Sequence, residues 1–155
     1  MIIDLCCGLG LSEWLEDDVV GIDIDPSVRP TIVADIRYLP LRKGIKPKIA
    51  HASPPCKYFS LARSLRTGYN EEGLAESFRL VAACFDAFAW LEPEMWTLEN
   101  PYYGFLRKII PTDLMLRYGA YDIPAKTTSL WSNKRALKRA IIPKDVKQRI
   151  ISAVS

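Results

Sequence analysis

The fold is decided by the first ten residues of the chain, Met1-Ile2-Ile3-Asp4-Leu5-Cys6-Cys7-Gly8-Leu9-Gly10. The run at 1–5 is short and mostly apolar, which predicts a strand buried on both faces. Gly8 and Gly10 end this strand, because glycine adopts turn conformations that other residues resist. A short helix is predicted at 11–15. The segment is therefore typical of the first strand, turn and helix of an open α/β sheet.

The rest of the chain alternates short apolar runs with helical patterns. The best helical pattern covers residues 72–91, where apolar side chains recur every three or four positions: Leu74, Phe78, Val81, Phe85, Phe88 and Ala89. Further strands are predicted at 19–24, 31–34, 48–52, 94–98, 114–121 and 127–132, and further helices at 102–110 and 143–154. This order predicts an α/β fold with a mostly parallel sheet flanked by helices.

Composition and charge indicate an ordinary globular chain. Apolar residues make up 49% and charged residues 25% of the 155 positions, which argues against disorder. The length fits one domain, residues 1–155. The net charge of +3 and the pI near 8.7 are too small to indicate a nucleic-acid partner on their own. No apolar run has the roughly 20 residues of a membrane span and no signal-peptide pattern opens the chain, so we expect no membrane partner.

The four cysteines, Cys6, Cys7, Cys56 and Cys84, form no CxxC pair and no metal-ligand spacing. We expect reduced thiols in a cytoplasmic protein that holds no metal. Cys84 falls on the apolar face of the predicted helix and is expected in the core.

Polar segments follow four of the predicted strands, at 4–10, 23–25, 53–56 and 99–101. Open α/β sheets bind ligands beyond the carboxyl ends of their strands, so these segments form the candidate site. Gly8 and Gly10 alone are weak evidence for a ligand site, because an ordinary strand-to-helix turn has the same pattern.

Three aspartates are candidates for binding a nucleoside. Asp23 ends the second predicted strand, where an acidic residue commonly hydrogen-bonds ribose hydroxyls. Asp25 is assigned to capping the turn around Pro26. Asp35 could accept a hydrogen bond from an adenine amino group with Ile36 covering the ring, or it could cap a helix; the two readings are equally good.

Ser53-Pro54-Pro55-Cys56 is the sharpest feature of the sequence. Two prolines fix the backbone after a strand, so the thiol of Cys56 is held at the sheet edge. A thiolate is a strong nucleophile, and Lys57 and Arg63 are near enough in sequence to favour it. The alternative is a buried, inert cysteine.

Glu99-Asn100-Pro101 follows the fifth predicted strand, which places Glu99 near Cys56 if the two strands are neighbours. A thiol beside a carboxylic acid suits nucleophilic attack assisted by an acid. The alternative is a helix start, with Asn100 as the cap and Pro101 at the first helical position. The two interpretations are compatible, because Asn100 can cap a helix while Glu99 faces the site. His51, the only histidine, lies inside a predicted strand and is interpreted as structural.

Taken together, these segments resemble the DNA cytosine-5 methyltransferases. The glycine turn is similar to that family's first motif, Ser53-Pro54-Pro55-Cys56 to its nucleophile loop, and Glu99-Asn100-Pro101 to its Glu-Asn-Val motif with Pro in place of Val. The segment Lys126-Thr127-Thr128-Ser129-Leu130-Trp131-Ser132-Asn133 looks like the Lys-Pro-Thr-x-x-Trp-x-Asn segment of small phage-type members. The family's Arg-x-Arg segment is not found, and neither is its late Gly-Asn-Ala-Val motif.

The resemblance implies the Rossmann-like fold of class I S-adenosylmethionine-dependent methyltransferases. The chain departs from the family in length, because the residues between Asn133 and Ser155 are too few for a recognition domain, so we expect no separate target-recognition domain. It implies that Cys56 and Glu99 are catalytic, with DNA as substrate and RNA not excluded. The implied cofactor residues are Asp4, Cys6, Gly8, Gly10, Asp23, Ile24, Asp35, Ile36 and Pro54. The implied nucleic-acid contacts are Lys57, Arg63, Arg66, Asn100 and Lys126, with Lys126 in the part of a missing motif arginine.

Two other readings stay open at this point. The chain could be a non-catalytic or partner-dependent module that binds cofactor or nucleic acid, with recognition supplied by a separate subunit or a second copy of the chain. It could instead methylate RNA cytosine.

Overall fold

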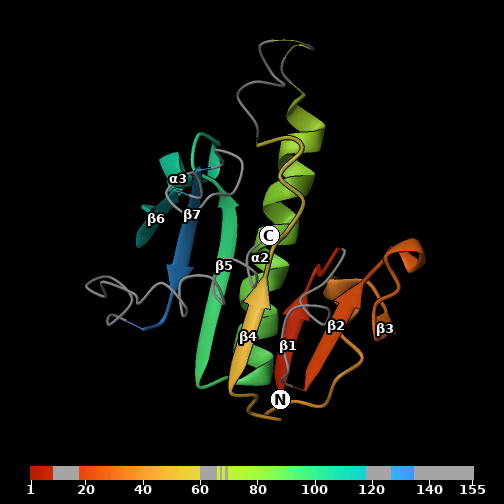
Figure 1. The fold of residues 1–155 in the computed structure, drawn as a ribbon. Coiled ribbons are helices and arrows are strands. Elements are labelled where there is room, and N and C mark those ends of the chain that lie inside the picture. Colours follow the sequence, from red (N-terminus) through yellow and green to blue (C-terminus); the bar gives the residue numbers. More distant parts are fainter. Residues whose placement is uncertain (9–17, 60–65, 67, 69, 118–126, 135–155) are drawn as a thin grey trace.

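The structure is a computed structural model that describes residues 1–8, 18–59, 66, 68, 70–117 and 127–134. Its centre is one seven-stranded sheet in the order β3-β2-β1-β4-β5-β7-β6 (Figure 1). The strands are β1 (Ile2–Leu5), β2 (Val19–Asp23), β3 (Ile32–Val33), β4 (Ile49–Ala52), β5 (Met95–Pro101), β6 (Leu114–Arg117) and β7 (Thr127–Ser132). The predicted α/β fold with a mostly parallel sheet is confirmed.

The five strands β3, β2, β1, β4 and β5 run parallel, with β1 in the middle. Leu5 at the end of β1 pairs with Ile22 on one side and with Ala52 on the other. The carboxyl ends of three strands therefore lie at one edge of the sheet, as the strand arrows show in Figure 1. All four residues of β1 are buried, which fits the apolar run that predicted it.

The other end of the sheet is antiparallel, since β7 pairs with both β5 and β6. This pairing prolongs β5 beyond the predicted end at Leu98, through Pro101, which pairs with Thr128. The prediction that Asn100 caps a helix beginning at Pro101 is therefore wrong. Proline is tolerated here because it is the last residue of the strand.

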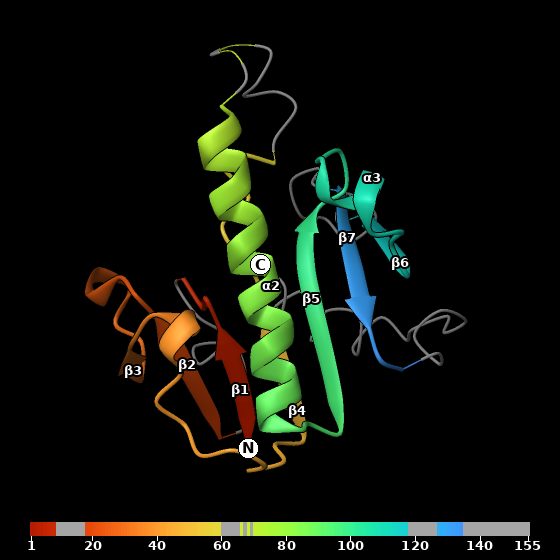
Figure 2. The same cartoon turned by 180° about the vertical axis from the view of Figure 1, so that it is seen from behind.

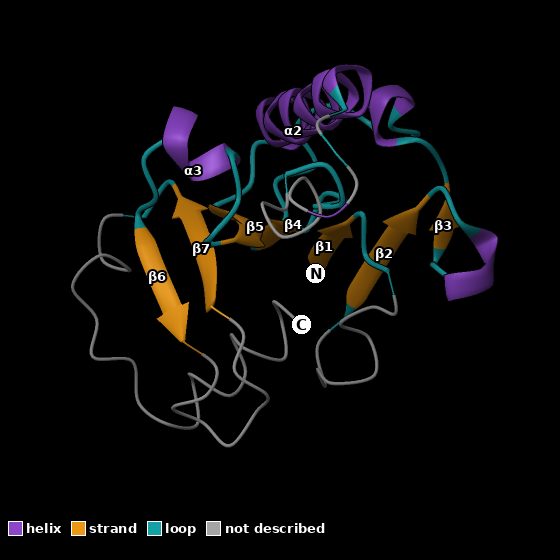
Figure 3. Ribbon diagram, turned by 90° about the horizontal axis from the view of Figure 1, so that it is seen from above, coloured by secondary structure: helices purple, strands orange, loops and turns teal. Residues whose placement is uncertain are grey.

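Helix α2 (Glu71–Leu91) covers one face of the sheet and contacts β4 (Figures 2 and 3). The side chain of Asn70 caps it by accepting a hydrogen bond from the Gly73 amide at 2.7 Å. Val81, Cys84 and Phe88 are buried as expected, whereas Ala89 of the predicted apolar face is exposed. Two short 3₁₀ helices, η1 (Pro26–Val28) and η2 (Ile36–Tyr38), follow β2 and β3.

The helix predicted at 102–110 is shorter, because only α3 (Leu106–Ile109) forms. Residues 102–103 make a turn that leads to Gly104. A Cβ at Gly104 would lie 3.0 Å from the Pro101 carbonyl oxygen and 3.2 Å from the Phe59 carbonyl oxygen, so this close approach favours glycine. The predicted helices at 11–15 and 143–154, and the part of the predicted strand beyond Arg117, lie outside the described residues.

His51 is part of a buried polar chain that links β4, β5 and the segment after β4. Its Nδ1 lies 2.8 Å from Thr97 Oγ1 and its Nε2 lies 2.9 Å from Ser53 Oγ. Burial lowers the pKa of His51 to about 4, so the ring is neutral at physiological pH. A neutral ring with one donor and one acceptor nitrogen suits two hydroxyl partners. This supports the interpretation of His51 as a structural residue.

This burial predicts an acid-sensitive fold. The unfolded chain protonates His51 below its ordinary pKa of 6.5, whereas the folded chain resists protonation down to about 4. Stability from neutral His51 is thus complete above pH 6.5 and is lost as the pH falls from 6.5 towards 4. We expect the free energy of unfolding in urea to drop by about 2 kcal/mol between pH 7 and pH 5.

The control is His51→Gln, measured over the same pH range. Because the chain has no other histidine, the slope between pH 7 and pH 5 should disappear in this variant even if its stability is lower throughout. An undiminished slope in His51→Gln would assign the acid sensitivity to other groups.

Candidate functional site

A cavity of about 310 Å³ opens at the carboxyl edge of β1, β2 and β4. Its lining combines apolar side chains with a few polar groups, which is typical of a small-molecule site. The lining residues are Cys6, Gly8, Ile22, Asp23, Ile24, Ala34, Asp35, Ile36, Arg37, Ser53, Pro55, Glu76 and Leu80. Six of these were predicted as cofactor residues, namely Cys6, Gly8, Asp23, Ile24, Asp35 and Ile36.

The turn after β1 shapes one wall of the cavity. Cys6 and Gly8 both have positive φ, at 55° and 53°. A Cβ built on Gly8 would meet no described atom within 4 Å, so the space beside it is open. The chain therefore changes direction at Gly8 without placing a side chain of this residue in the cavity.

Asp23 fastens this turn to the end of β2. Its Oδ2 accepts a hydrogen bond from the Gly8 amide at 2.9 Å, and its Oδ1 accepts one from the Asp25 amide at 2.9 Å. Each carboxylate oxygen has two lone pairs, so both oxygens can accept a further hydrogen bond from a ligand in the cavity. Asp25 caps η1 by accepting from the Ser27 amide at 2.8 Å, as predicted.

Asp35 caps η2 and is also held by an arginine. Its Oδ1 accepts from the Arg37 amide at 2.9 Å, and the Arg37 guanidinium reaches both of its oxygens. The side-chain hydrogen bond from Arg37 is the main reason why the pKa of Asp35 lies below its usual range. The capping role is confirmed, and much of the carboxylate's acceptor capacity is already used by Arg37. Ile36 is buried and lines the cavity.

Sequence reasoning missed the part of the site that α2 supplies. Glu76 and Leu80 lie on successive turns of this helix and line the cavity, and Arg37 bonds Glu76 at 2.8 Å. Helical spacing groups these residues on one face, but nothing in the sequence states which sheet edge the helix meets. Ser53 and Pro55 line the cavity, while the predicted Pro54 is buried beside it. Asp4 is buried within β1 and is not among the lining residues.

The four thiols differ in their surroundings. Burial, followed by the nearby charges of Asp4 and Asp23, raises the pKa of Cys7 to about 12, so this thiol stays neutral. A hydrogen bond with Cys6, together with burial, raises the pKa of Cys84, which lies in the core as expected. Cys56 is only half-buried and follows the two prolines at the sheet edge. The thiols of Cys7 and Cys84 are thus poor nucleophiles, whereas Cys56, the predicted nucleophile, lies at the edge of the sheet.

The backbone around Cys56 is anchored on both sides. Before it, the Pro54 carbonyl accepts a hydrogen bond from Asn100 Nδ2 at 3.2 Å. After it, the Tyr58 ring packs so closely on α2 that a Cβ at Gly73 would lie 2.5 Å from it, and Phe59 is fully buried against Phe78. Cys56 therefore lies on a short, fixed segment, as the proline pair predicted.

Glu99 lies in β5, beside β4. Ala52 pairs with Leu98, so Ser53 and Glu99 come next on two neighbouring parallel strands. Glu99 has 5% of its surface exposed, and Asn100, with 0%, reaches Pro54. The segments that carry Glu99 and Cys56 are therefore in direct contact. Thr128 of β7 donates a hydrogen bond to Glu99 Oε1, a partner for which the sequence predicted no role.

The predicted nucleic-acid residues differ in their exposure to solvent. Lys57 is exposed, with its Nζ 5.3 Å from the centre of the Tyr58 ring, and Arg66 is exposed. Asn100 is wholly buried between strands in this structure. Arg63, Lys126 and the predicted cofactor residue Gly10 lie outside the described residues.

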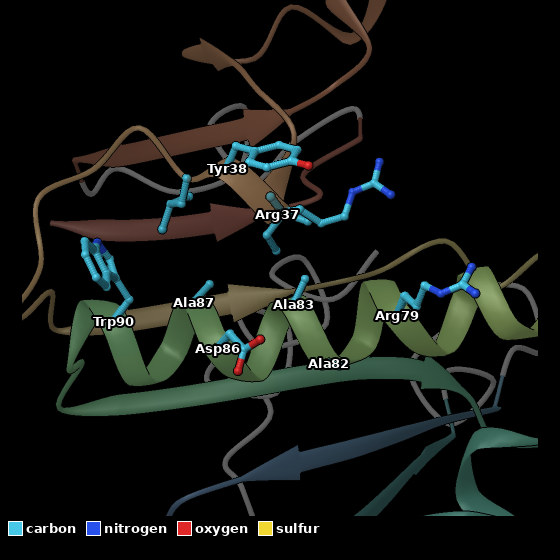
Figure 4. A pocket seen from close by; sticks show the side chains of 10 residues that line it. Arg37, Tyr38, Arg79, Ala82, Ala83, Asp86, Ala87 and Trp90 are labelled. Carbon is cyan, nitrogen blue, oxygen red and sulfur yellow. The ribbon is translucent and has the colours of Figure 1, made fainter.

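A second cavity, of about 480 Å³, lies between η2 and α2 (Figure 4). Tyr38 and Leu39 border it from the η2 side, and Ala83, Asp86 and Trp90 border it from the helix. Although this cavity is the larger of the two, Ile36 is the only predicted site residue in its lining, and no strand end reaches it. Size alone therefore does not identify the functional site.

The described residues contain neither a cluster of metal ligands nor a helix that could span a membrane. Within them, no group of three or more His, Cys, Asp or Glu side chains is placed to hold a metal ion. No helix in the same part of the chain is long and apolar enough to cross a membrane.

The sheet order, with β7 inserted antiparallel between β5 and β6 and a cavity at the carboxyl edge of β1 and β2, defines the class of fold. It is the Rossmann-like fold of class I S-adenosylmethionine-dependent methyltransferases, as predicted. Comparison with solved structures agrees. A putative DNA modification methyltransferase encoded within prophage Cp of E. coli is similar with a TM-score of 0.60 and 18% identity, over 90% of this chain and 48% of that one.

Among curated proteins, the chain is similar to the probable DNA (cytosine-5)-methyltransferase of Frog virus 3 (isolate Goorha). The two are 29% identical over 106 residues, which is 59% of this chain and 50% of the relative. An S-adenosylmethionine-dependent methyltransferase from Mesorhizobium loti aligns with a TM-score of only 0.36 at 18% identity, over 88% of this chain and 57% of that one. No family model matches the chain. The chain thus spans about half the length of the curated relative and of the prophage structure.

Proposed function

We propose that this protein transfers a methyl group from S-adenosylmethionine to carbon 5 of cytosine in DNA, through a covalent adduct with Cys56. The observation that carries the proposal is the contact between two segments beside the donor cavity, where Asn100 of β5 bonds the Pro54 carbonyl, two residues before Cys56. That contact joins the segment of the thiol to the strand that carries Glu99, and Ser53 and Pro55 of the same segment line the cavity. The likeness to the frog virus protein supports the same reaction.

The residues of the cavity suit S-adenosylmethionine. Asp23 can accept hydrogen bonds from the two ribose hydroxyls while it still holds Gly8 and Asp25. Ile36 and Leu80 offer apolar surface to the adenine ring, and the open space beside Gly8 leaves room for the methionine part. When bound, the donor supplies an electrophilic methyl group on a sulfonium sulfur.

The chemistry explains why a thiol and a carboxyl group are needed together. Carbon 5 of cytosine is a poor nucleophile until the Cys56 thiolate adds to carbon 6, which makes carbon 5 enamine-like. Glu99 bonds ring nitrogen 3 and the amino group and so stabilises the charge that develops during this addition. Carbon 5 then takes the methyl group, its proton leaves to a base, for which water is a candidate, and the thiolate is expelled.

The substrate and setting follow from the same proposal. A cytosine in duplex DNA must be flipped out of the helix to reach Cys56. Lys57 and Arg66 are exposed and can contact phosphates, through interactions that salt would weaken. Residues 1–155 act as one catalytic domain, and a separate subunit or a second copy of the chain takes part in target recognition. The four free cysteines fit a reducing, cytoplasmic compartment.

The first test is Cys56→Ser, assayed by tritiated methyl transfer to DNA and, in parallel, to RNA. We expect transfer to disappear while donor binding, measured by calorimetry, persists, because a hydroxyl is a far weaker nucleophile than a thiolate. Cys84→Ala is the control for loss of a thiol, since Cys84 is buried in the core and does not itself line the cavity, although it contacts Cys6, which does. Transfer that survives in Cys56→Ser would contradict the covalent mechanism.

Trapping separates catalysis from mere binding. DNA containing 5-fluorocytosine should form an adduct that survives denaturation with the unaltered protein but not with Cys56→Ser. A protein that binds DNA and donor yet forms no adduct would be a non-catalytic module, and transfer to RNA alone would change the substrate class.

The second test is Asp23→Ala, measured by calorimetry with S-adenosylmethionine. Loss of hydrogen bonds to a charged acceptor should weaken donor binding at least about tenfold. Asp25→Ala is the control, because this neighbouring carboxylate only caps η1. Equal affinity of Asp23→Ala and the unaltered protein would remove Asp23 from the donor site.

A further inference from the structure

The Thr128 hydroxyl is enclosed between two oxygen atoms of β5. It donates a hydrogen bond to Glu99 Oε1, and it lies 3.1 Å from the backbone carbonyl oxygen of Asn100. Thr128 has 0% of its surface exposed, so water cannot take over either contact. A hydroxyl has one proton to donate, and it can therefore satisfy only one of these two acceptors at a time.

The strand register explains why this side chain meets Glu99. In the antiparallel β5–β7 ladder, Glu99 pairs with Leu130 and Pro101 pairs with Thr128. Residues two apart on a strand share a face, so Glu99 and Thr128 lie diagonally on the same face of the sheet. Asn100 and Ser129, which pair with each other, lie on the opposite face.

The two acceptors match the two protonation states of Glu99. When Glu99 is ionised, the Thr128 proton points at Oε1 and makes a charge-assisted hydrogen bond. When Glu99 is protonated, Thr128 can accept the carboxyl proton and turn its own proton to the Asn100 carbonyl. Rotation of one hydroxyl thus keeps the carboxyl group in place in both states.

We propose that Thr128 is the positioning residue for Glu99, holding its carboxyl group in one orientation whether or not it carries a proton. This inference rests on the proposed function, in which Glu99 must meet nitrogen 3 and the amino group of cytosine as charge develops on the ring. A carboxyl group that is free to rotate about its last bond would meet that edge less often.

The direct test is ¹³C NMR of protein labelled at the glutamate side-chain carboxyl carbons, with the Glu99 signal assigned from its absence in Glu99→Gln. Thr128→Val keeps the shape and the strand preference of threonine but removes the hydroxyl, so the Glu99 signal should move. Thr128→Ser restores the hydroxyl and should return the signal. Ser129→Ala is the matched control, because the buried Ser129 hydroxyl has no hydrogen-bond partner among the residues that the structure describes, and it should leave the signal in place. An unmoved signal in Thr128→Val overturns the proposal.

The kinetic test uses methyl transfer by the same variants. Thr128→Val should lower kcat about tenfold with little change in the KM for the methyl donor, and Thr128→Ser should recover most of the loss. In the double variant with Glu99→Gln, removing the hydroxyl should cost nothing further, because Thr128 acts through Glu99. If Glu99→Gln is slow but Thr128→Val is as fast as the unaltered protein, the inference fails and the proposed function stands. If Glu99→Gln and Cys56→Ser both transfer normally, the proposed function fails, and the NMR result still decides whether Thr128 holds Glu99.

Discussion

The parallel pairing of β1 with β2 on one side and β4 on the other is the constraint on which the site depends. It aligns Leu5 with Ile22 and Ala52, so the chain leaves three strands at the same edge and at nearly the same height. The end of each strand carries a different kind of group: a glycine turn follows β1, Asp23 ends β2 and the proline pair follows β4. These three strand ends, together with η2 and α2, line the cavity.

Asp23 and Asp35 both lie at this edge of the sheet, and both use their carboxylate oxygens for hydrogen bonds within the protein. Asp23 joins the turn after β1 to the turn after β2 and keeps acceptor capacity on both oxygens. Asp35 uses more of its hydrogen-bond acceptor capacity within the protein, because the Arg37 guanidinium bonds its carboxylate oxygens. Arg37 in turn bonds Glu76 of α2. Asp23 therefore keeps more acceptor capacity for a ligand than Asp35 does, and η2 is connected to helix α2, which lines the cavity.

The parallel half of the sheet could be predicted from sequence because its signals are local. Buried parallel strands appear as short apolar runs, and their ends are marked by glycine, proline or aspartate. The end of β5 could not be predicted in this way, since it is decided by β7, whose pairing residue Thr128 lies far along the chain from Pro101. The Asn-Pro pair resembles a helix start, and the long-range pairing overrides it. Glu76 and Leu80 escaped prediction for a similar reason, because the packing of α2 on the sheet, and not its own pattern, directs them to the cavity.

The two faces of β5 carry different contacts of the candidate site. Asn100 faces one way, is wholly buried and holds the Pro54 carbonyl, which fixes the segment of Cys56. Glu99 faces the other way and is held by Thr128. Because consecutive residues of a strand point to opposite faces, one rigid peptide unit sets the place of both. A shift of β5 along β4 would therefore move the Glu99 carboxyl group and loosen the Cys56 segment together, and the antiparallel pairing with β7 on the far side opposes that shift.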